Sequence, residues 1–177
     1  PGGAGLGYAV VKSRADQLQA KLTSDIQAGQ RQLEAGKASL EQANAKHDSG
    51  LVADALAHFV AAEAQFKAAT QLADQSKLLY YLEQVPSVGN VVKPKHVAVD
   101  GIAAMGAAIA QAGQQLSQLD GQLIKPAAGG PAGQSLLTVV DATNKSLAGV
   151  RDALARAQSA AATVTVLRPY FCATSAS

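Results

Sequence analysis

The chain has 177 residues and a net charge of +2, and 48% of its residues are hydrophobic although only 4% are aromatic. This length is enough for one domain with a sizeable core. The charged residues are few and scattered, whereas nucleic-acid-binding proteins gather Lys and Arg on one face, so no nucleic-acid partner is predicted. The single cysteine, Cys172, excludes a disulfide within the chain and a cysteine-based metal site.

Residues 1–14 form a small apolar run that ends in Lys12 and Arg14. We interpret this run as a flexible start, or as the outer end of a membrane helix whose first part lies upstream of this chain. A complete membrane span needs about 20 consecutive apolar residues. The richest stretch, GIAAMGAAIAQAG at 101–113, is shorter than that.

The first helix is predicted over residues 8–46. Bulky residues recur every seven positions, and a small residue follows three positions after each: Ile26, Leu33 and Leu40 with Gly29, Gly36 and Ala43. This is the spacing of a coiled-coil seam, and the small residues allow a partner helix to come close. The sequence HDSG (47–50) ends the helix, with Gly50 as a break and Asp48 or Ser49 as the N-cap of the next helix.

The second helix is predicted over 51–83, because Pro86 stops it and the residue before a proline is biased away from helix. Its expected inner face consists of Leu56, Phe59, Phe66, Ala69 and Ala73.

The third helix is predicted over 94–124, with Pro94 near its first position. The fourth is predicted over 131–167, and Arg168 and Pro169 close it. Apolar residues alternate by three and four along both helices: Ile102, Met105, Ile109, Ala112, Leu116, Leu119 and Leu123, then Leu136, Val140, Thr143, Leu147, Val150, Leu154, Ala157, Ala161 and Val164. Residues 168–177 are interpreted as a tail or the start of a further domain.

These segments together predict an all-α fold. Short connections between long helices favour antiparallel neighbours. We therefore expect an antiparallel four-helix bundle over residues 8–167, built from two helical hairpins.

Residues that carry chemistry are scarce. The chain has no G-x-S-x-G motif, and Cys172 has no histidine near it in the sequence. Asp54 and His58 are four residues apart, a spacing that fits either half of a metal site or a solvent-facing polar pair, and no further ligands are evident. We predict no enzymatic activity, no catalytic residue, no metal and no cofactor.

One segment, YYLEQVPSVGNVVKP (80–94), interrupts the helical pattern. It fits either an exposed recognition loop or the corner at which a helical hairpin ends, and the turn residues Gly89 and Asn90 favour the corner. As a recognition loop it supplies the candidate interaction residues Tyr80, Tyr81, Pro86, Val88 and Gly89.

The order of these elements resembles the N-terminal helical region of the bacterial family called domain of unknown function 4012. The similarity rests on Ala57, Phe59, Ala62, Phe66, Ala69, Leu82, Val85, Pro86, Val88 and Gly89. The resemblance implies a surface protein that is held by an N-terminal membrane helix, with this region outside the membrane and a larger mixed domain after it. It also implies that the P-S-V-G corner is a structural hallmark, and it supplies no catalytic residue.

We therefore expect a non-enzymatic, extracytoplasmic helical bundle that acts as a spacer or as an element of protein interaction or self-association. The alternative is a sensor that binds a small ligand between its helices. A buried polar cluster at one end of the bundle would favour the sensor, and a wholly apolar core would favour the spacer.

Overall fold

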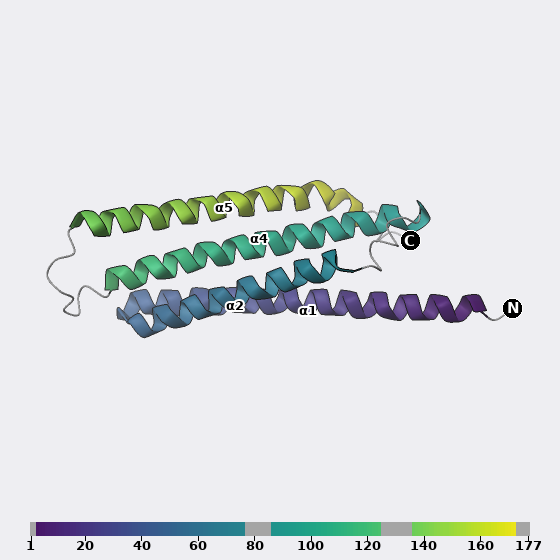
Figure 1. Cartoon of the computed structure of the whole chain (residues 1–177), viewed down its shortest axis with the longest axis horizontal. Helices are drawn as coiled ribbons and strands as arrows, with labels where there is room; N and C mark the ends of the chain where they lie inside the picture. Colours follow the sequence, from purple (N-terminus) through teal and green to yellow (C-terminus); the bar gives the residue numbers. More distant parts are fainter. Residues whose placement is uncertain (1–2, 77–85, 125–135, 173–177) are drawn as a thin grey trace.

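A computed structural model describes residues 3–76, 86–124 and 136–172 of the chain. These residues form four α-helices: α1 (Gly3–Lys46), α2 (Ser49–Asp74), α4 (Pro86–Ile124) and α5 (Leu136–Cys172) (Figure 1). The described part of the chain contains no β-strand. The prediction of an all-α helical bundle is confirmed.

Each helix packs against the helix that follows it in the chain, and α1 also makes a smaller contact with α4. Neighbouring helices run antiparallel, so α1–α2 and α4–α5 are the two expected hairpins. Among the described residues, α5 packs along α4 and makes at most marginal contact with α1 or α2. Figure 1 accordingly shows α1 and α5 at opposite edges, so the bundle is open between them.

The junction between α1 and α2 follows the predicted capping. Asp48 has an extended backbone, and its side chain accepts a hydrogen bond of 2.8 Å from the backbone N–H of Gly50. The chain turns at His47, which has a φ of 52°, in the left-handed region. Gly50 is not the predicted break, because it lies in the first turn of α2.

The predicted bounds around the second junction are wrong. The helix α2 ends at Asp74 rather than near Glu83, and the backbone N–H of Gln75 closes it by donating to the carbonyl of Gln71. The helix α4 begins at Pro86 rather than near Pro94, so Gly89 and Asn90 are helical and do not form a turn. The preference of proline for a first helical position applies to Pro86.

The outer ends of two helices also differ from prediction. The helix α1 begins at Gly3 rather than near Tyr8, and α5 continues through Pro169 to Cys172. A proline inside a helix removes one backbone hydrogen bond, but its φ of about −65° is compatible with the helix, and both Pro94 and Pro169 lie within helices. The predicted start near Pro131 lies outside the described residues.

Two phenylalanines of α2 hold three helices together. The ring of Phe66 lies against Gly29 of α1 and Gly106 of α4, and the ring of Phe59 lies against Gly36 and Gly113 in the same way. Both rings are at least 94% buried. The predicted small residues of the first helix therefore admit α2, as the heptad pattern indicated.

Alanines form most of the remaining core. Ala62 and Ala110 pack with Phe66, and Ala69, Ala73 and Ala103 pack with Leu22 at the other end of α2. Small side chains permit a close approach of the helix backbones. The core of the described residues is therefore thin and rich in alanine.

Candidate functional site

The structure does not test the predicted interaction residues. Tyr80 and Tyr81 lie outside the described residues, and the backbones of Pro86, Val88 and Gly89 lie in the first turns of α4. Their role in an interaction stays a prediction.

The predicted inner face of the fourth helix is only half covered. Thr143, Val150, Ala157 and Val164 are partly or fully buried, but Val140, Leu147 and Leu154 are 47–48% exposed. The residues of α5 that the structure buries most are Ser146, Ala153 and Ala157. Small residues let α5 approach α4 closely, and this contact turns the leucines away from the core.

The third helix shows the same departure from prediction. Ile109 and Leu116 are each 38% exposed although the pattern assigned both to the core. These residues and those of α5 form what we call the apolar strip, which consists of Ile109, Leu116, Val140, Leu147 and Leu154. Its members on each helix are seven residues apart.

The members of the apolar strip lie on one side of the α4–α5 pair. Gly149 of α5 approaches the side chain of Gln115 of α4 on the opposite side. At about 100° per residue, Leu116 lies roughly 100° round α4 from Gln115, and Leu154 lies roughly 140° round α5 from Gly149. Because α4 and α5 are antiparallel, both rotations lead past the buried alanines to the same side of the pair.

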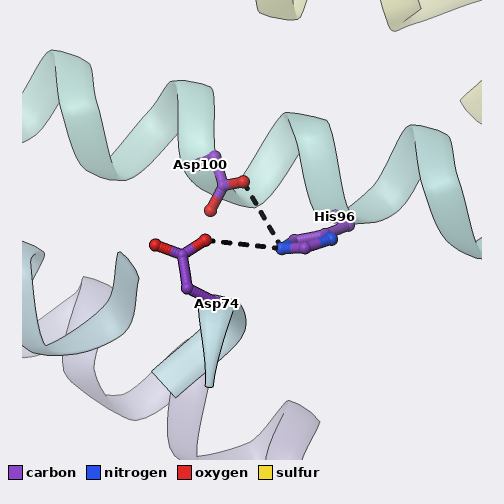
Figure 2. Close-up of side chains that lie close together, drawn as sticks. All are labelled: Asp74, His96 and Asp100. Carbon is purple, nitrogen blue, oxygen red and sulfur yellow. Dashed lines mark ion pairs between the residues drawn. The ribbon is translucent and has the colours of Figure 1, made fainter. Parts of the chain in front are cut away.

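A second cluster joins the end of α2 to α4 (Figure 2). The Nε2 atom of His96 lies 3.4 Å from Oδ2 of Asp100, one turn further along α4. The same Nε2 atom lies 4.0 Å from Oδ1 of Asp74, the last residue of α2. The three side chains are partly open to solvent, from 21% exposed for His96 to 62% for Asp74.

This His–Asp cluster (Asp74, His96 and Asp100) has two chemical options. A protonated imidazole forms ion pairs with the two carboxylates, and a neutral imidazole offers a metal ligand beside two oxygen ligands. Sequence reasoning missed the cluster. The spacing of His96 and Asp100 was visible as i, i+4, but Asp74 comes from another helix and only the packing of α2 on α4 brings it there.

The half site that the sequence did single out has a different partner. Nδ1 of His58 lies 2.7 Å from the side-chain oxygen of Gln32 on α1. Asp54 is exposed, and within the described residues it has no two further His, Cys, Asp or Glu side chains close enough to share a metal ion with it. The pair therefore gains no further ligand from the packing.

A polar network lies along the same α2–α4 seam. The carboxylate of Glu63 accepts hydrogen bonds from Gln111 (2.7 Å) and Gln114 (2.6 Å) of α4 and pairs with Lys67 at 2.6 Å. Partial burial raises the pKa of Glu63, but the hydrogen bonds and the charge of Lys67 outweigh burial, so the pKa lies below its ordinary value. The network ties α2 to α4 at an edge of the core.

The buried polar residues in the described part of the chain are few: Ser146 of α5, named above, Ser117 and Asp25. Ser117 is buried and donates to the carbonyl of Gly113 in its own helix at 3.0 Å. The buried carboxylate of Asp25 pairs with Lys21 one turn before it. Both groups are thus satisfied within one helix, and neither points to a ligand.

Comparisons with protein-family models, with curated proteins and with solved structures found no match to this chain. The resemblance to domain of unknown function 4012 has no support from them. Within the described helices, no segment is apolar enough over a sufficient length to cross a membrane.

Proposed function

We propose that this chain is a non-catalytic interaction module that associates with a second copy of itself through the apolar strip. The observation that carries the proposal is the partial exposure of Leu147 and Leu154, which lie seven residues apart on the side of α5 that does not contact α4. Among the described residues, a monomer offers this side of α5 no helix to pack against.

Heptad spacing identifies the kind of partner. Apolar residues seven apart form a straight stripe that fits another helix. A second copy supplies such a helix. A two-fold axis perpendicular to α5 between Leu147 and Leu154 makes the two copies of α5 antiparallel and places each leucine opposite the other leucine of the second copy. The strip is therefore self-complementary.

The core supports an interaction module over the alternative sensor. Alanine, phenylalanine and glycine fill the space between α1, α2 and α4, and the buried Ser117 and Asp25 have partners in their own helices. Placement outside the cell membrane rests on the family resemblance alone, and self-association does not depend on it.

Light scattering over a concentration series tests the proposal. We expect the mass of the wild-type chain to rise from monomer to dimer, and the dimer dissociation constant to increase at least tenfold in the double variant Leu147→Gln, Leu154→Gln, because each leucine loses its apolar contact. The control is Val60→Gln, which replaces a 51% exposed residue on α2 outside the strip and should leave the dimer unchanged.

A wild-type chain that stays monomeric at every concentration contradicts the proposal. So does a double variant that dimerises as the wild type does while its circular dichroism shows an intact fold.

A further inference from the structure

The His–Asp cluster has the dimensions of a small metal site. One potential ligand atom from each of Asp74, His96 and Asp100 lies within 4.8 Å of the other two. Tetrahedral coordination at metal–ligand distances near 2.0–2.1 Å separates neighbouring ligand atoms by about 3.3 Å. The observed separations from Nε2 of His96 are 3.4 Å and 4.0 Å, so a small rotation of the exposed Asp74 side chain suffices.

We propose that Asp74, His96 and Asp100 bind one divalent transition-metal ion, with Zn²⁺ as the best match. One imidazole and two carboxylates suit Zn²⁺, whereas Ca²⁺ and Mg²⁺ take oxygen ligands alone. Three protein ligands leave a fourth position for water. The ion joins the last turn of α2 to α4 across the connection between them.

The backbone on both sides of the site is held by the core. Ala73, next to Asp74, is 99% buried and packs in one cluster with Ala103 of α4, and Val99 packs against that cluster. Val99 lies between His96 and Asp100 in the sequence. The backbone positions of the three ligands are therefore set before an ion arrives, which lowers the entropy cost of binding.

Charge favours a cation over a simple ion pair. Figure 2 shows both carboxylates directed toward Nε2 of His96. A single N–H at Nε2 of His96 can point at only one acceptor oxygen. Both distances from Nε2 to the carboxylate oxygens exceed the 2.7–2.9 Å of a charge-assisted hydrogen bond. An ion between the three atoms attracts both carboxylates and accepts the lone pair of the neutral imidazole.

Isothermal titration of the 177-residue chain with Zn²⁺ near pH 7.5 tests the site. We expect one ion per chain, and at least tenfold weaker binding for Asp74→Asn and for His96→Gln. Asp74→Asn is the sharper variant, because Asp74 is 62% exposed and its replacement keeps the shape of the side chain. Titration with Co²⁺ should give the visible absorption of a tetrahedral site in the wild type, reduced in both variants.

The matched control is the carboxylate–imidazole pair Asp54 and His58, which lies on α2 alone. Asp54→Asn and His58→Gln should bind Zn²⁺ as the wild type does, because this pair lacks a third ligand. The titration is repeated in the Leu147→Gln, Leu154→Gln background, so that its result does not depend on self-association. Absence of Zn²⁺ binding by the wild type, or binding that Asp74→Asn and His96→Gln leave unchanged, overturns the proposal.

Discussion

At the scale of single residues, two aromatic rings set the distance between three helices. Phe59 and Phe66 each lie between a glycine of α1 and a glycine of α4. A Cβ atom at Gly106 would lie 2.5 Å from the ring of Phe66, and a Cβ atom at Gly29 would lie 2.8 Å from it. The rings thus occupy the space that a side chain at each of these glycines would fill.

Substitution of Gly106 measures this dependence. Alanine raises helix propensity by about 1 kcal/mol, but a methyl group forced into a packed core costs about 1–3 kcal/mol. Because the ring of Phe66 is confined on both sides, we expect Gly106→Ala to lower the free energy of unfolding by about 1–2 kcal/mol, measured by urea denaturation.

The control for this substitution is Gly121→Ala in the same helix. There a Cβ atom would lie 3.6 Å from Val52, an ordinary contact, so the variant should be as stable as the wild type or more stable by up to about 1 kcal/mol. Equal effects of the two substitutions would show that the rings do not need the glycine.

Glu63 is a second residue whose setting predicts a measurement. Its pKa lies below the ordinary value of 4.5, so the folded state binds its proton more weakly than the unfolded state. The charged carboxylate therefore stabilises the fold above about pH 4.5, and this contribution disappears as the pH falls through the folded-state pKa. We expect Glu63→Gln to be less stable than the wild type at pH 7, with a difference that shrinks toward pH 3.

Urea denaturation at pH 7, 5 and 3 measures that difference. Glu41→Gln serves as the control, because its carboxylate is 67% exposed in a pair with Lys37 on one helix. A stability difference between wild type and Glu63→Gln that stays constant over this pH range would contradict the assignment.

At the scale of helices, the bounds of α4 depend on which proline begins the helix and which proline lies within it. Pro86 opens α4, while Pro94 lies about two turns further along the same helix. A proline inside a helix loses one backbone hydrogen bond and its ring crowds the carbonyl four residues earlier, at a cost of about 3 kcal/mol. Burial of apolar side chains along the 39-residue helix exceeds that cost. Packing of α4 on α2 and α5 therefore outweighs a local preference.

The face of α5 that contacts α4 is a second feature that is decided at the scale of helices. Its pattern contains a stripe of small residues beside a stripe of leucines. Contact with α4 through Ala153 and Ala157 brings the backbones close, and it leaves Leu147 and Leu154 for another surface. The proposed dimer follows from that choice of face.

At the scale of the whole molecule, the open arrangement divides the chain into a three-helix unit and an outer helix. The rings of Phe59 and Phe66 need both α1 and α4, whereas α5 packs along α4. We expect a fragment of residues 1–130 to unfold cooperatively on heating, with a lower midpoint than the 177-residue chain. We also expect it to be monomeric, because three of the five members of the apolar strip are gone.

The matched fragment is 47–177, which keeps α5 but lacks α1. It removes one glycine wall from each ring, and we expect it to lose cooperative unfolding by circular dichroism. If 47–177 melts cooperatively and 1–130 does not, then α5 rather than α1 belongs to the folding core.

Residue patterns alone predicted the all-α fold, the antiparallel hairpins, a helix cap at Asp48 or Ser49, the small-residue face of the first helix and the phenylalanine face of the second. Those features follow from local spacing, because a seven-residue repeat places its members on one face of any helix. They required no knowledge of which helix lies beside which.

Contacts between helices fix the start of α4, the uncovered leucines and the His–Asp cluster. The exposure of Leu147 depends on where α5 sits relative to α1, and the sequence pattern is the same for an open and a closed bundle. The approach of Asp74 to His96 depends on the register of α2 against α4, which the Phe66–Gly106 contact sets. Contacts between helices decide such features because periodicity specifies faces, but only packing specifies neighbours.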